Sequence, residues 1–270
     1  GTVGELWGWH YGFTIAGFGM LAGLLTMVLL QDRLLGDIGK HPNQRFSKKE
    51  PLQEKLKEQE INRIKAIFIF GIFSVVFWIG FEQMGGLLNL YTYEKVDRSL
   101  LGFEIPATWF QSLNPMFIFL FAPIISAIWM LFDGRGRPIS TPQKFSMGLA
   151  LMGAGFVCMI GSAIELVSSD NGTTSMLWLV GAYFLQTMGE LCISPVGLSM
   201  VNLLAPARYS AMAMGFWFLN ISLAGWLAGE VGALSEAFSE LNIFIGLTAV
   251  SLAAALLLWL MNSRIVKWMS

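Results

Sequence analysis

Glu190 is a carboxylate near the middle of an apolar stretch, Met176–Leu198, that is long enough to cross a lipid bilayer. Charged side chains at membrane depth are costly, and they usually face the interior of a helix bundle or a wet cavity. Because residues four apart share a helix face, Gln186 and Ser194 form a polar stripe with Glu190. Pro195 removes a backbone hydrogen bond and is expected to kink the helix. The pattern predicts a functional site on this helix.

A second carboxylate, Glu82, lies in another long apolar stretch, towards its outer half. Trp78 and Glu82 are four residues apart and share a helix face, which Asn89 nearly continues two turns on. The depth of Glu82 favours a functional role. The alternative interpretation is a packing contact near the membrane interface.

Asn114 and Trp217 are two further candidates. Asn114 precedes Pro115 at the start of an apolar stretch, where it can be either a helix N-cap or a site residue. Trp217 lies three residues before Asn220, so the two share a helix face. A single Trp in a membrane helix is more often part of the core or of the interfacial belt than a ligand contact. Both interpretations stay open for each residue.

No apolar stretch carries Lys or Arg at its centre, so the two carboxylates have no basic partner within the predicted membrane region. A buried carboxylate without a counter-charge is expected to be neutral part of the time. It is then either a proton carrier or half of a pair. A cationic ligand or another helix bundle would complete such a pair.

The composition is that of an integral membrane protein, with 55% apolar and 13% charged residues. Cys158 and Cys192 both lie in apolar stretches, which argues against a disulfide framework. The sequence contains no basic patch with interleaved aromatic residues, the pattern that would indicate binding to nucleic acid. The only histidines, His10 and His41, are far apart, and the stretches hold no metal-ligand cluster and no evident Ser–His pair. We therefore expect no metal, no bound cofactor and no enzymatic activity.

Seven apolar stretches reach the length of about 20 residues that a bilayer core requires. The sequence therefore predicts an all-α integral membrane protein with seven transmembrane helices. Pairs of glycines spaced for close helix packing occur at Gly19/Gly23 and Gly225/Gly229. The predicted spans are Trp9–Leu30, Ile64–Leu88, Pro115–Phe132, Phe145–Leu166, Met176–Leu198, Ala211–Leu234 and Ile243–Met261.

Basic residues alternate between the connections. The first, third and fifth connections and the C-terminal tail carry Lys or Arg, whereas the fourth and sixth connections carry neither. In the second connection, Lys95 and Arg98 are offset by acidic residues. The positive-inside rule then puts the N-terminus of this chain outside and its C-terminus in the cytoplasm of a multi-pass cell-membrane protein.

The first connection is the longest and the most charged. From Glu50 to Lys65 apolar residues recur at near-helical spacing, which predicts a charged cytoplasmic helix that runs into the second span. This segment is either a solvated linker or a docking surface for a partner. We expect three parts: a first transmembrane helix at 1–30, a partly helical linker at 31–63 and a six-helix bundle at 64–270.

Four motifs together resemble those of the proton-dependent oligopeptide transporters, a family of the major facilitator superfamily. A fifth segment, Asp133-Gly134-Arg135-Gly136-Arg137, is similar to a cytoplasmic loop signature of that superfamily. The four motifs occur in the family's order over nearly the whole chain. They are Phe-Trp-x-x-Phe-Glu-Gln at 77–83, Phe-Gln-Ser-Leu-Asn-Pro at 110–115, Gly-Glu-Leu-x-x-Ser-Pro-x-Gly-Leu at 189–198 and Met-Gly-x-Trp at 214–217.

The resemblance covers the C-terminal half of such a transporter. The first span is similar to the family's sixth helix, and the remaining spans are similar to helices seven to twelve. The N-terminal bundle, with its Glu-x-x-Glu-Arg motif and Lys, has no counterpart here. Two extra helices that many bacterial members insert are also absent, and only the charged linker stands at that place. The start at Gly1 rather than Met fits a fragment.

The resemblance also implies roles for individual residues. Glu190 matches the glutamate that receives the peptide's amino terminus, and Ser194 lies one turn along in the same pocket. Asn114 matches an asparagine that contacts peptide backbone groups. Trp78 and Trp217 match aromatic walls of the side-chain pockets. In addition, Glu82 matches the glutamate that pairs with a basic residue of the N-terminal bundle and couples the outer gate to protonation.

The implied function is proton-coupled import of di- and tripeptides by alternating access, with the proton as coupling ion. The expected partners are peptides, membrane lipid and the missing N-terminal bundle, and the isolated chain is expected to be inactive. One alternative is a seven-helix receptor, which the predicted topology allows, although the last span lacks the Lys that a retinal protein needs. The other alternative is a structural membrane fragment without transport activity.

Overall fold

The structure, a computed structural model, describes residues 1–38 and 56–269, and it divides into two units, Gly1–Glu54 and Lys55–Ser270. In the first unit, α1 (Thr2–Trp7) is joined to α2 (Trp9–Leu35) through Gly8. Gly8 has a φ of 111°, a conformation that favours glycine. The chain folds back so closely that a Cβ on Gly12 would lie 3.1 Å from the Cα of Gly4.

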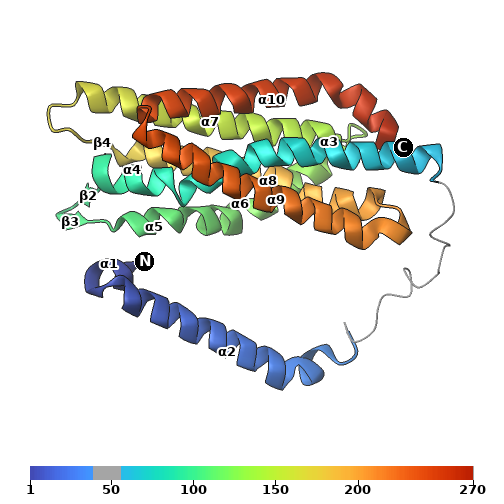
Figure 1. The fold of residues 1–270 in the computed structure, drawn as a ribbon, viewed down its shortest axis with the longest axis horizontal. Helices are drawn as coiled ribbons and strands as arrows, with labels where there is room; N and C mark the ends of the chain where they lie inside the picture. Colours follow the sequence, from blue (N-terminus) through green and yellow to red (C-terminus); the bar gives the residue numbers. More distant parts are fainter. Residues whose placement is uncertain (39–55, 270) are drawn as a thin grey trace. The chain divides into compact units, whose positions relative to one another are not determined.

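The second unit is a helix bundle, drawn in cyan to red in Figure 1. Its long helices are α3 (Glu58–Phe81), α6 (Leu113–Gly134), α7 (Thr141–Ser168), α8 (Met176–Leu204), α9 (Ser210–Ala233) and α10 (Glu240–Met269). Its short helices are α4 (Leu87–Lys95), α5 (Ala107–Gln111) and the 3₁₀ turns η2 (Glu82–Met84), η3 (Ala207–Tyr209) and η4 (Leu234–Glu236).

Short strands occur in two of the connections. They are β1 (Val96–Asp97), β2 (Ser99–Leu100), β3 (Phe103–Glu104) and β4 (Thr174–Ser175). β1 pairs with β4 in parallel, with Val96 opposite Thr174, and β2 pairs with β3 as an antiparallel hairpin. The β1–β4 ladder joins two connections at one end of the bundle, and the β2–β3 hairpin lies within one of them.

Seven helical segments of the described residues are long and apolar enough to cross a membrane, and they follow the seven predicted spans in order. The predicted helical membrane fold is confirmed. Each segment is longer than its predicted span, because backbone hydrogen bonding does not depend on hydropathy and continues past the predicted ends. α10, for example, runs beyond the predicted end at Met261 to Met269. Of the charged helix predicted over Glu50–Lys65, the part from Glu58 forms the start of α3, and residues 50–55 lie outside the described residues.

The second span is broken, where the sequence predicted a continuous helix over Ile64–Leu88. α3 ends at Phe81 and is followed by η2, and Gly86 has φ −102° and ψ −103°, outside the helical region, before α4 begins. In contrast, α6 and α8 continue as helices through Pro123 and Pro195.

Two side chains bond the backbone around this break. The amide nitrogen of Gln83 donates to the carbonyl oxygens of Ile79, at 3.0 Å, and of Ala228 on α9, at 3.1 Å. The hydroxyl of Tyr183 on α8 donates to the carbonyl oxygen of Met84 at 3.1 Å. In hydrocarbon no water can satisfy such carbonyl groups. The break is therefore held to α8 and α9 by groups that compensate for it.

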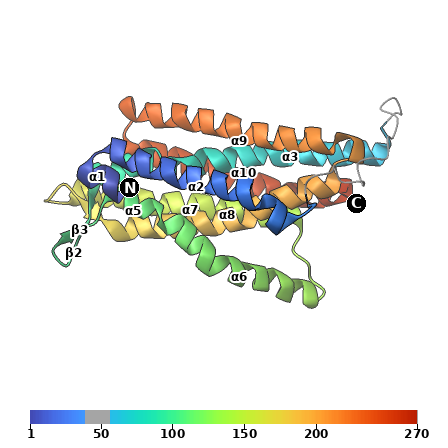
Figure 2. The same ribbon diagram turned by 90° about the horizontal axis from the view of Figure 1, so that it is seen from below.

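Close helix packing in the bundle centres on α7, which packs along both α8 and α10. A Cβ on Gly148 of α7 would lie 2.8 Å from the carbonyl oxygen of Gly189 on α8, so the two backbones nearly touch. The predicted packing pair Gly225/Gly229 has open space beside it in this unit. α6 packs mainly on α8 and diverges from the other helices toward its C-terminal end (Figure 2).

Candidate functional site

Asn114 and Glu190 meet directly between α6 and α8. The amide nitrogen of Asn114 donates to Glu190 Oε2 at 2.8 Å and to Thr187 Oγ1 at 3.1 Å. Thr187 in turn donates to the carbonyl oxygen of Tyr183 at 2.6 Å. Asn114 is the second residue of α6, after the N-cap position Ser112, and its side chain crosses to α8. Its observed role is therefore the contact with Glu190, not the N-cap.

Glu190 is half-buried and forms no ion pair with any described residue. Its other neighbours on α8 are hydroxyl and amide groups or apolar side chains. A carboxylate held by one neutral amide keeps free lone pairs that can accept further hydrogen bonds. The arrangement can receive a cationic donor such as an ammonium group, and charge-assisted hydrogen bonds of this kind are the strong ones.

Gln186, one turn before Glu190, is fully buried, and neither polar atom of its amide has a partner among the described residues. Its side chain packs so tightly on α7 that a Cβ on Gly155 would lie 2.7 Å from Gln186 Cγ. Gln83, by contrast, is 1% exposed and its amide makes two hydrogen bonds. The unpaired amide of Gln186 therefore destabilises the fold, whereas the hydrogen bonds of Gln83 stabilise it.

This contrast gives a stability prediction. Gln186→Leu should leave the protein as stable as before or more stable, because an unpaired buried amide costs about 1–3 kcal/mol. Gln83→Leu should destabilise it by about 1–3 kcal/mol, because two hydrogen bonds are lost. Thermal unfolding of both variants in the same detergent measures the difference. A larger loss of stability in Gln186→Leu than in Gln83→Leu would contradict this interpretation.

The other predicted residues lie at different places on the bundle. Ser194 is half-buried one turn beyond Glu190. Trp217 on α9 is 2% exposed and packs so closely on α8 that a Cβ on Gly197 would clash with its ring. Its ring meets Phe145 edge-to-face at 6.3 Å. In this structure Trp217 is therefore buried between α9 and α8, against the helix turn that follows Ser194.

Trp78 is half-buried on α3 and belongs to a cluster of aromatic rings on its own helix. Its ring centroid lies 5.6 Å from that of Phe77 and 5.0 Å from that of Phe81, both in edge-to-face geometry. No hydrogen bond or ring contact among the described residues links Trp78 to the Asn114–Glu190 pair.

Glu82 lies apart from Glu190, at the break in the second span, and its side chain is exposed. It lines a hollow of about 580 Å³ together with the small residues Gly225, Ala228, Gly229 and Gly232 of α9. The small residues on this face of α9 leave room beside the carboxylate. Glu82 is therefore accessible from the surface of this bundle.

Tyr183 and Thr187 extend the predicted polar stripe of Glu190, but the sequence did not predict their hydrogen bonds, nor those of Gln83 at the break. The signal for the break was the Gly85-Gly86 pair directly after Glu82-Gln83-Met84, since consecutive glycines inside a helix lower its stability. Thr187 carried a weaker signal, as a hydroxyl three residues before Glu190. No group of three His, Cys, Asp or Glu side chains that could hold a metal ion occurs in the described part of the chain.

Comparisons with known proteins confirm the family resemblance. The family model described as the POT family matches residues 28–247. The chain is 33% identical to an uncharacterized transporter, YclF, of Bacillus subtilis, over 96% of this chain and 62% of that protein. It is 39% identical to the peptide transporter YePEPT of Yersinia enterocolitica, over 66% of this chain and 35% of that protein. It is also 30% identical to dipeptide and tripeptide permease B of Xenorhabdus bovienii, over 77% of this chain and 44% of that protein.

Solved structures show the same similarity. A crystal structure of a peptide transporter POT in complex with sulfate has a TM-score of 0.85 at 26% identity, with 99% of this chain and 64% of that chain covered. A POT family transporter in complex with a thioalcohol-conjugated peptide has a TM-score of 0.71 at 27% identity, with 97% of this chain and 55% of that chain covered. This chain thus spans less than two thirds of these relatives. Because the family model matches most of its residues, the chain belongs to the POT family.

Proposed function

We propose that this chain is the C-terminal half of a proton-coupled symporter that imports di- and tripeptides, and that it supplies the site for the peptide's amino terminus. The observation that carries the proposal is the Asn114–Glu190 pair. A half-buried carboxylate with no basic partner among the described residues can receive an ammonium group, and the amide beside it can bond a peptide carbonyl. The peptide transporters among the relatives support peptides as the substrate class.

The remaining site residues complete this proposal. Ser194 extends the pocket from Glu190 by one turn, and Trp78 and Trp217 form walls for the peptide's side chains. Trp217 would have to become accessible in another conformation, since it is buried here. Glu82 couples proton binding to the outer gate by pairing with a basic residue of an N-terminal bundle. The proton is the coupling ion, and no bound cofactor is needed.

The same proposal fixes the orientation and the parts of the chain. The N-terminus of this chain lies outside and the C-terminus in the cytoplasm of a cell membrane, as the distribution of Lys and Arg favours. Residues 1–30 act as the sixth helix, residues 31–63 as the cytoplasmic linker and residues 64–270 as the second bundle. Alternating access follows from rocking of this bundle against the missing one.

Reconstitution tests the proposal. Proteoliposomes that contain this chain together with the N-terminal bundle of a family member should accumulate labelled dialanine when the outside is acidic. Proteoliposomes with this chain alone should not, because half of the central cavity is missing. Accumulation by the chain alone would refute the half-transporter assignment. If the assembled pair binds labelled dialanine but ignores the pH gradient, proton coupling is refuted while peptide recognition stands.

A further inference from the structure

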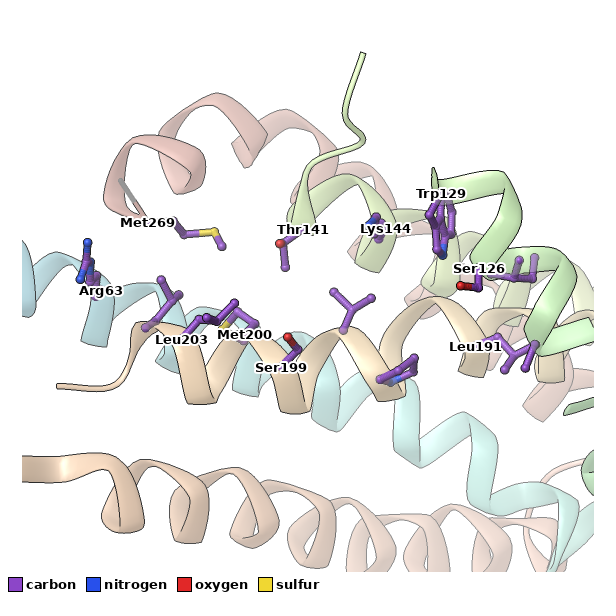
Figure 3. A pocket seen from close by; sticks show the side chains of 15 residues that line it. Arg63, Ser126, Trp129, Thr141, Lys144, Leu191, Ser199, Met200, Leu203 and Met269 are labelled. Carbon is purple, nitrogen blue, oxygen red and sulfur yellow. The ribbon is translucent and has the colours of Figure 1, made fainter. Parts of the chain in front are cut away.

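A second cavity, of about 680 Å³, lies between α6, α7 and α8, and the start of α3 and the end of α10 close it (Figure 3). On α8 the cavity is lined by a stripe that includes Leu191, Pro195 and Ser199. Each of these follows a position of the Glu190 and Ser194 stripe by one residue, so the two stripes lie on different faces of the helix. Neither Asn114 nor Glu190 lines the cavity. The cavity is therefore separate from the proposed peptide site, although the two share α8.

The charges of this cavity all have one sign. Among the described residues that line it, Arg63 and Lys144 are the charged ones, and neither Asp nor Glu takes part. Hydroxyl groups of Ser126, Thr141 and Ser199 add hydrogen-bonding capacity, and the rest of the wall is apolar apart from the indole of Trp129. Cations combined with an apolar wall fit a ligand with an anionic head and hydrocarbon chains.

Lys144 is placed to bind such a head. It lies in the first turn of α7, where the helix dipole disfavours a cation and favours an anion. Its Nζ lies 5.1 Å from the centroid of the Trp129 ring of α6, so the indole holds the ammonium group toward the cavity. Figure 3 shows Lys144 and Trp129 on one side of the cavity and Arg63 at its far end. The two cations therefore lie at opposite ends of the cavity, and an anion beside Lys144 would contact that ammonium group.

The surroundings connect the cavity to lipid. α6 diverges from the other helices on this side (Figure 2), and its outer face exposes Ile124, Met130 and Leu131. The cavity is within the range of volumes of small-molecule sites, which suits a headgroup, and acyl chains can continue along α6. The same end of the bundle carries Arg135, Arg137 and Arg208, so it faces the leaflet that the proposed topology calls cytoplasmic.

We propose that this cavity binds the phosphate-bearing headgroup of an anionic phospholipid through Lys144. Inorganic phosphate shares the recognised chemistry, but it lacks chains that could use the apolar wall. The site is independent of the peptide site, and its test needs no transport activity.

Native mass spectrometry of this chain in detergent, titrated with phosphatidylglycerol, phosphatidylcholine or inorganic phosphate, tests the proposal. Phosphatidylglycerol should bind more tightly than the other two. Lys144→Gln should weaken it about five-fold. Lys65→Gln is the matched control, since Lys65 is an exposed cation on the same helix as Arg63 and does not line the cavity.

Each outcome decides the proposal. Weaker binding in Lys144→Gln, with the Lys65→Gln control unchanged, supports it. An equal loss in Lys144→Gln and Lys65→Gln would show general attraction to a basic surface and would overturn it. Inorganic phosphate binding that depends on Lys144, with no preference for phosphatidylglycerol, would assign the cavity to a soluble anion. Thermal unfolding of Lys144→Gln identifies a folding defect, and a folded variant with undiminished lipid binding also overturns the proposal.

Discussion

Glu190→Gln in the assembled transporter should weaken dipeptide recognition by about 10- to 100-fold and abolish uptake at low substrate concentration. The glutamine has nearly the same shape, and its carbonyl oxygen can still accept the hydrogen bond that Asn114 donates to Glu190 Oε2 at 2.8 Å. What is lost is the negative charge that an ammonium group needs. The concentration dependence of labelled dialanine uptake measures the effect.

A substrate without an amine provides the internal control. Competition by an N-acetylated dipeptide, which carries no ammonium group, should be nearly unchanged by Glu190→Gln. The matched variant is Glu230→Gln, which removes an exposed carboxylate from α9 and should keep normal uptake. Wild-type uptake by the Glu190→Gln variant would show that another group receives the amino terminus.

Glu82→Gln should abolish accumulation driven by a pH gradient and preserve exchange of peptide across the membrane. The carboxylate is exposed at the break in the second span, beside the hollow on α9, and it lies apart from the Asn114–Glu190 pair. Neutralising it should remove the response to protons without removing peptide contacts. Uptake of labelled dialanine under a pH gradient, compared with counterflow at equal pH, separates the two effects.

Glu94→Gln is the control for this experiment, because Glu94 is an exposed carboxylate near the end of α4 on the same broken span. It should behave as the unaltered protein in both assays. Gradient-driven accumulation by the Glu82→Gln variant would exclude Glu82 as a coupling residue. Loss of counterflow as well would instead make it part of the peptide site or of the fold.

The spans could be predicted from the sequence because hydrocarbon tolerates only long apolar helices. Their ends could not, since helices such as α10 continue into the charged region. The break at Gly86 was missed because hydropathy averages over a window and does not register two glycines. The Glu190 stripe was visible from four-residue spacing. The contact of Glu190 with Asn114 could not be predicted. The two residues are 76 apart in the sequence, and their distance in space depends on how α6 packs on α8.

The glycine pairs show the same limit. Gly225 and Gly229 have the spacing of a packing motif, yet nothing fills the space beside them in this unit. Gly148 and Gly189, on different helices, make a close backbone approach of α7 and α8. Spacing along one helix predicts which surface can be approached closely. It does not identify the neighbour, since that depends on the other helices, including those of any bundle outside this chain.

The break in the second span divides one transmembrane crossing into two helices, α3 and α4. A continuous helix transmits a tilt along its whole length, whereas a few non-helical residues can act as a hinge between two rods. The backbone bonds of Gln83 and Tyr183 keep this hinge anchored to α8 and α9. A tilt of α3 therefore need not pass to α4, which is held to α7 by the buried Tyr91 and its hydrogen bond to Ser162. In such a crossing one end can tilt with its neighbours without displacing the other end.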